Sequence, residues 1–236
     1  MSFTSRSRAY DRNRVLRQAA LAQARKRRRR AISLYRQVLA LESGNLEIHA
    51  KLAPLLAETR QRFDAWRSFS AGAAGHVREG RTQQAIELYR QATHFLPREI
   101  ESWLSLARIL RSEGRQEDAI EALLDGRRYF RGRRRRPQAI YLLRQLREIQ
   151  EWHVDALLDL ARLLAASRQR EEAAALLRGL AERSEGRVLR RACAAQWRLS
   201  PTLRHTWAWL RASTARSASN SATESGADAP TRSATR

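Results

Sequence analysis

Cysteine, glycine and proline are all scarce in this chain of 236 residues. The single cysteine, Cys193, excludes an internal disulfide framework, and its place in a helical pattern predicts a small buried side chain rather than a reactive thiol. Ten glycines and five prolines stand against abundant Ala, Leu, Arg, Glu and Gln, the residues that enter helices at least cost. The composition therefore predicts an all-α fold.

Long apolar runs are also missing. No stretch approaches the roughly 18 apolar residues that a membrane-spanning helix needs. The first residues, MSFTSRSRAYDRNRVLRQ, contain no apolar segment of the kind found in secretory signals, so we expect a cytoplasmic protein.

Motifs for catalysis are absent as well. The five histidines show no metal-ligand spacing, and the sequence holds no glycine-rich phosphate loop or nucleophile elbow. We expect a protein that is not an enzyme and uses no metal or cofactor.

Lysine is rare, and arginine carries almost all of the formal net charge of +22, since Lys26 and Lys51 are the only lysines. A GC-rich genome would favour arginine codons, but it does not explain 46 basic against 24 acidic side chains. The excess predicts a positive field that attracts anionic partners. Residues 1–30 alone hold eleven basic side chains against Asp11.

A gap-free repeat with a period of about 54 residues is the most informative pattern in the chain. Three copies begin at Ala31, Ala85 and Ala139, and they open with AISLYRQ, AIELYRQ and AIYLLRQ. A fourth, degraded start places Trp197 where the first two copies have Tyr35 and Tyr89. Self-similarity at this scale is typical of helical repeats, whose units bury their apolar faces against their neighbours.

Each copy contains three amphipathic patterns with apolar residues at i, i+3, i+4 and i+7. The first helix should follow the opening alanine. The second should span about residues 46–58, 100–113 and 154–167, and the third should begin near Ala65, Ala119 and Ala173. Pro54 falls inside a second helix, where we expect it to remove a hydrogen bond and cause a kink.

Within each copy, a spacing of about 34 residues separates the opening alanine from a second one, as in Ala31 and Ala65, Ala85 and Ala119, and Ala139 and Ala173. Residues 66–133 carry small and bulky side chains at defined positions. The small residues are Ala73, Ala85, Ala92, Ala107, Ala119 and Gly126; the bulky ones are Phe69, Tyr89, Trp103, Leu106 and Leu123, with Pro97 ending a helix. This pattern resembles the tetratricopeptide repeat, which has small and bulky side chains at these positions, and the resemblance implies that two helices touch at the small ones. The resemblance covers about residues 12–212. The alternate step, from Ala65 to Ala85 and from Ala119 to Ala139, is shorter than the family's and implies that one longer helix closes one repeat and opens the next.

The resemblance implies an antiparallel helix-pair solenoid of about 10–12 helices that acts as a protein-interaction scaffold. Such arrays grip a segment of a partner in a groove, and the candidate groove residues here are Arg108, Arg111, Arg128 and Arg162. The basic composition favours an acidic protein segment as that partner. Fold alone does not identify it.

Two arginine clusters are the candidate anion-binding sites, and each precedes the first helix of a copy. They contain Arg27, Arg28, Arg29 and Arg30, and Arg133, Arg134, Arg135 and Arg136. Turns are places where charge is easily solvated, but adjacent arginines repel one another unless an anion neutralises them. A nucleic-acid-binding helical repeat is therefore the alternative function, and attachment to an anionic membrane ranks last.

The chain divides into three segments on this interpretation. Residues 1–11 should be basic and flexible, residues 12–212 should form the helical array, and the Ser/Ala/Thr-rich residues 213–236 should be disordered. Trp103 and Trp197 fall at core positions of the repeat. Trp207 and Trp209 lie on a short expected helix over residues 201–212, which we expect to cover the last apolar edge.

Overall fold

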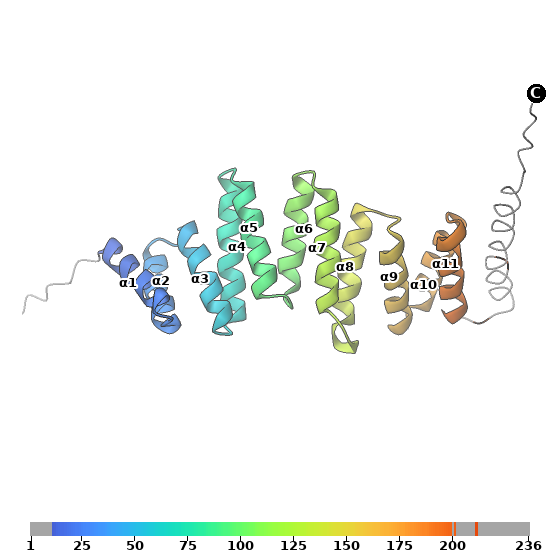
Figure 1. Cartoon of the computed structure of the whole chain (residues 1–236), viewed down its shortest axis with the longest axis horizontal. Coiled ribbons are helices and arrows are strands. Elements are labelled where there is room, and N and C mark those ends of the chain that lie inside the picture. The colour runs from blue at the N-terminus through green and yellow to red at the C-terminus, as the bar shows by residue number, and fades with distance from the viewer. Residues whose placement is uncertain (1–10, 200, 202–210, 212–236) are drawn as a thin grey trace, which may run out of the picture. The chain divides into compact units, whose positions relative to one another are not determined.

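The computed structural model describes residues 11–199, 201 and 211. These divide into two compact units, unit 1 ending at residue 129 and unit 2 beginning at residue 130. Of the expected flexible residues 1–11, residues 1–10 lie outside the described residues, as do the tail from residue 213, Trp207 and Trp209, whereas Asp11 caps the first helix. All regular structure in the described part is helical (Figure 1). No helix there is both long and apolar enough to cross a membrane.

Unit 1 is a run of antiparallel helices joined by short turns. Its helices are α1 (Arg12–Ala24), α2 (Arg28–Leu41), α3 (Leu46–Glu58), α4 (Arg62–Arg78), α5 (Thr82–Phe95), α6 (Ile100–Ser112) and α7 (Gln116–Tyr129). Each helix packs on the next one along the chain, as the left and middle parts of Figure 1 show. Asp11 and Asn45 cap α1 and α3 by accepting hydrogen bonds from the backbone N–H groups of Arg14 and Ile48.

Unit 2 repeats this arrangement with fewer helices. A short 3-10 turn, η1 (Arg133–Arg135), leads into α8 (Arg136–Ile149), α9 (Val154–Ala166), α10 (Arg170–Glu182) and α11 (Gly186–Leu199). Neighbouring helices again contact one another, and α11 also touches α9. Leu157 of α9, Leu180 of α10 and Ala192 of α11 meet in a buried apolar cluster.

The helix boundaries recur with the same period as the sequence. Helices α2, α5 and α8 begin at Arg28, Thr82 and Arg136, and α3, α6 and α9 begin at Leu46, Ile100 and Val154. The second helices match the expected spans almost to the residue, and turn residues such as Asn45 before α3 and Gly114 after α6 mark their ends. The first and third helices start nearly one turn before the positions expected from the alanines.

The small residues of the repeat form the helix contacts. The spacing alanines Ala31, Ala65, Ala85, Ala119, Ala139 and Ala173 are all fully buried, which confirms the predicted contacts. Gly126 shows how tight such a contact is, because a Cβ atom added there would lie 2.7 Å from Cγ of Trp103. Paired antiparallel helices with these small residues at their seams make the fold a tetratricopeptide-like helical repeat.

Helix α4 is the longest helix described, with 17 residues, and it packs against both α3 and α5. The expectation of a longer helix at both short steps is only half met: α4 is long at the step from Ala65 to Ala85, but α7, at the step from Ala119 to Ala139, has 14 residues, as α5 and α8 do. Helix α3 continues through Pro54 without interruption from Leu46 to Glu58.

Two expectations about side chains need correction. Trp197 is 45% exposed rather than in the core, because α11 buries Ala192, Cys193 and Gln196, one position out of register with the earlier first helices. The other concerns the arginine clusters, parts of which lie inside helices rather than before them. Arg28, Arg29 and Arg30 form the first turn of α2, and Arg136 begins α8. Arginine enters a helix at little cost, so a run of arginines does not delimit a helix start.

Candidate partner-binding surfaces

A groove on unit 2 bears one of the predicted site residues, Arg162. It encloses about 650 Å³ between α9 and α11, with one residue of α10 at its base. Its apolar wall consists of Leu158, Ala161, Ala165, Ala166, Leu177, Ala194, Ala195 and Leu199. The small alanine side chains allow the backbone of a bound segment to come close to both helices. We call this hollow the α9–α11 groove.

Charged side chains form the polar rim of the α9–α11 groove. On α9, the Arg162 guanidinium donates to Asp159 at 2.6 Å, and Arg191 of α11 reaches across to Asp155 of α9 at 2.6 Å. Arg198 also lines the groove, and among the described residues it makes no ion pair that would neutralise it. The rim therefore combines two ion pairs with one uncompensated positive charge, which favours a carboxylate over a cation in the bound segment.

The other three predicted groove arginines lie in unit 1. Arg108 and Arg111 are exposed on α6 at an i, i+3 spacing, so they share one face of that helix. Burial raises the pKa of Tyr89 on α5, and the positive charge of Arg108 partly opposes this effect. Arg128 lies on α7, where it pairs with Asp125 at 2.9 Å. Of the four candidates, Arg162 lines the α9–α11 groove.

One arginine of each cluster forms a contact with a neighbouring helix. In the first cluster, Arg28 forms an ion pair with Glu58 at the end of α3. In the second, Arg136 donates to the backbone carbonyl of Ala166 at the end of α9. These contacts are equivalent, because Arg136 and Ala166 occupy the positions of Arg28 and Glu58 two copies further along the repeat. Each therefore has a structural role that the sequence pattern did not indicate.

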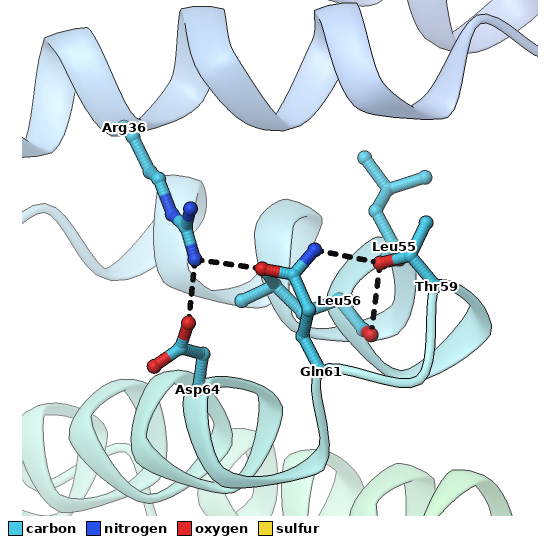
Figure 2. A network of polar contacts seen from close by, with 6 residues as sticks. All are labelled: Arg36, Leu55, Leu56, Thr59, Gln61 and Asp64. Carbon is cyan, nitrogen blue, oxygen red and sulfur yellow. Dashed lines mark hydrogen bonds and ion pairs between the residues drawn. The ribbon is translucent and has the colours of Figure 1, made fainter.

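A second recurring arginine joins the first and third helices of a copy. In Figure 2, Arg36 of α2 donates to Oδ2 of Asp64 at 2.6 Å and to Oε1 of Gln61 at 3.0 Å. Gln61 in turn donates to the Thr59 hydroxyl, which donates to the carbonyls ending α3 (Figure 2). In unit 2, Arg144 pairs with Glu172 at 2.9 Å in the same way. Because these pairs are exposed, each stabilises the fold by at most about 1 kcal/mol.

Several surface residues were not identified as candidate site residues from the sequence. Arg191, Arg198, Asp155 and Asp159 line the α9–α11 groove, but nothing in their local pattern separates them from other charged helix positions. Phe63 at the start of α4 is 73% exposed, the most exposed large apolar residue among those described. Phe63 could have been recognised from the sequence, because Arg62-Phe63-Asp64 places a phenylalanine at a position where the repeat otherwise has a polar side chain.

Similarity to known proteins is a similarity of fold alone. No family model matches the chain, and no curated protein does. Among solved structures, YrrB, described as a TPR protein with an unusual peptide-binding site, is 14% identical, with 83% of this chain and 89% of that chain covered and a TM-score of 0.27. The TPR-like repeats of a putative kinesin light chain from Podospora anserina are 19% identical, with coverages of 88% and 95% and a TM-score of 0.29. The P58(IPK) TPR domain is 15% identical, with coverages of 80% and 65% and a TM-score of 0.28. Likeness at this level is too low to support a function.

Proposed function

We propose that this protein is a non-catalytic interaction scaffold that holds an acidic segment of a partner protein. The α9–α11 groove carries this proposal, because it combines an alanine-rich wall with Arg198 and Arg162 at its rim. A tetratricopeptide-like array presents such grooves on rigid helices, so a bound segment loses entropy while the scaffold loses little.

The chemistry of the groove defines the segment that it should accept. Apolar side chains of the partner would cover Leu158, Leu177 and the alanines, and their burial would provide most of the affinity. A carboxylate of the partner would meet Arg198 and compete with Asp159 for Arg162. Arginine binds a carboxylate through two parallel hydrogen bonds, which fixes the direction of the segment.

Selection from a phage-displayed random peptide library on the full chain tests the proposal. The enriched peptides should combine aspartate or glutamate with leucine-like side chains, and their dissociation constants should be measured by fluorescence anisotropy. Changing Arg162→Ser and Arg198→Ser together should weaken binding about tenfold or more, since hydrogen bonds to charged groups each contribute about 1.5–3 kcal/mol.

A pair of control substitutions distinguishes binding in the groove from general attraction to the positively charged surface. Arg147→Ser with Arg178→Ser removes the same charge from exposed positions of unit 2 outside the groove, and it should change affinity little. Ala195→Tyr should block the groove without changing charge, because Ala195 is only partly buried and its side chain borders the hollow. If peptide binding survives Ala195→Tyr and falls equally in both charge variants, the α9–α11 groove is not the binding site.

A further inference from the structure

Charge in unit 1 is concentrated in its first half. Residues 11–67 hold 14 basic side chains against five acidic ones, whereas residues 68–129 hold nine against nine. Within residues 11–129, the whole positive excess therefore lies on α1, α2, α3, the beginning of α4 and the turns between them. A function that needed only general basicity would not require this separation.

Contacts within unit 1 bring two of the basic turns together. The ion pair between Arg28 and Glu58 joins the first turn of α2 to the end of α3. Arg29 of α2 and Gln61 of the α3–α4 turn line one shallow hollow of about 560 Å³, together with Arg36. The α1–α2 turn and the α3–α4 turn thus form one surface, which we call the cationic edge: Lys26, Arg27, Arg29, Arg30, Arg60, Arg62 and Phe63.

Residues of the cationic edge are unfavourable for the stability of the free protein. Lys26 and Arg60 have φ values of 56° and 64°, in the left-handed region that favours glycine. The corresponding turns of the neutral half hold Gly80 and Gly114 at φ values of 72° and 74°. The neutral half of the unit thus follows the usual rule at equivalent positions, and the basic half does not.

The start of α2 at the cationic edge is unfavourable in the same sense, as is that of α5, which begins after Arg81 with no capping bond. Arg27 is the N-cap of α2 but makes no capping hydrogen bond, and the first turn of α2 contains arginines and no acidic residue. Positive charge there opposes the helix dipole, whereas α7 begins with Glu117 and Asp118. A bound polyanion would remove this repulsion. Residues that break local rules without a structural gain are expected at functional sites.

Phe63 indicates which kind of polyanion fits the cationic edge. It is 73% exposed in the first turn of α4, next to Arg62, and the Arg67 guanidinium lies 5.8 Å from the centre of its ring. An aromatic ring surrounded by arginines can stack on an unpaired base while the arginines contact the flanking phosphates. A duplex hides the faces of its bases, and aspartate and glutamate side chains offer no aromatic face to stack on the ring. We propose that the cationic edge of unit 1 binds single-stranded nucleic acid, through phosphate contacts of Arg27, Arg29 and Arg62 and stacking on Phe63.

The test measures binding of the full chain to fluorescein-labelled oligo(dT) of about 20 nucleotides by anisotropy, over a series of salt concentrations. The logarithm of the affinity should fall linearly with the logarithm of salt. Arg27→Ser, Arg29→Ser and Arg62→Ser combined should reduce the slope by about 2, because each phosphate contact to a single strand contributes about 0.7. The melting temperature should stay level or rise, since serine is a better N-cap than arginine.

The control variant removes the same charge from the neutral half of unit 1. Arg78→Ser, Arg90→Ser and Arg98→Ser combined should leave the affinity within about twofold of the original and the slope almost unchanged. Phe63→Ala should weaken binding about tenfold with an unchanged salt slope, and Phe63→Tyr should restore it, because stacking does not depend on salt in the way that phosphate contacts do. A duplex of the same length should bind more weakly than the single strand.

The outcomes separate this proposal from the alternatives. Equal losses in both charge variants together with no effect of Phe63→Ala would mean general electrostatic attraction and would overturn it. Binding only to vesicles rich in phosphatidylserine, or only to polyglutamate, would overturn it in favour of a membrane or a protein partner. Ala195→Tyr blocks the groove of unit 2 and should leave oligonucleotide binding intact, so each proposal can fail without the other.

Discussion

Replacing Gly126 with alanine should lower the stability of the protein, although alanine is the better helix former. Gly126 lies within α7, and an added Cβ atom would be 2.7 Å from Cγ and 2.8 Å from Cδ2 of Trp103. The indole cannot easily move away. It is buried, its Nε1 donates to the carbonyl of Pro97 at 3.0 Å, and its ring stacks on Tyr129 at 5.6 Å between centroids.

The expected change in the free energy of unfolding is the sum of opposing contributions. Alanine in place of glycine in a helix interior stabilises by about 0.5–1 kcal/mol. Overpacking a buried contact costs about 1–3 kcal/mol, and weakening the indole hydrogen bond adds about 1 kcal/mol. The clash therefore outweighs the propensity gain, and we expect a net loss of about 2 kcal/mol, measured by urea denaturation followed by circular dichroism.

Gly179→Ala is the matched control, because Gly179 is also a helical glycine beside a tryptophan. Its added Cβ atom would lie 3.6 Å from Cη2 of Trp152, which is an ordinary van der Waals contact. This variant should be more stable than the original by up to about 1 kcal/mol. Trp103→Leu should reduce the effect of Gly126→Ala in a double-mutant cycle. Stabilisation by both alanines, or simple additivity with Trp103→Leu, would show that the described contact between α6 and α7 is wrong.

Two further predictions concern a turn and a buried histidine. Arg60→Gly should raise the free energy of unfolding by about 0.5–1 kcal/mol, because Arg60 has a φ of 64°, and Gly114→Arg at the equivalent turn should lower it by a similar amount in the same denaturation assay. Burial, and secondarily the charge of Arg81, lowers the pKa of His76 below its usual value of 6.5, so the unfolded chain binds the proton more readily. The contribution of neutral, buried His76 to the free energy of unfolding is fully present above about pH 7. It declines as the pH falls through 6.5 toward the lower pKa of the folded state. His76→Gln should therefore flatten the fall in melting temperature between about pH 7 and 5, and an unchanged pH profile would contradict the assignment.

Much of the fold could be predicted from the sequence because helix identity depends on local and periodic features. The burial of Ala85, Ala119 and Ala139 follows from a strict spacing, since a larger side chain would separate the helices at those points. The end of α6 could be predicted from Gly114, because the left-handed turn after a helix favours glycine. The start of α2 could not, since arginines enter the first turn as readily as they stay in a loop.

The sequence by itself determined the helical class, the order of the helices and the alanine seams, because these follow from the helical periodicity of the apolar residues and from the fixed spacing of the repeat. Only the tertiary structure decided which arginines are neutralised. Arg28 and Arg36 find Glu58 and Asp64 on other helices, and Arg198 lines a groove with no such partner among the described residues. It also placed Trp197 at the surface and Phe63 in solvent beside the basic turns. These outcomes depend on how far one helix is rotated and shifted against the next, and that geometry is set by packing across the seams rather than by any local pattern.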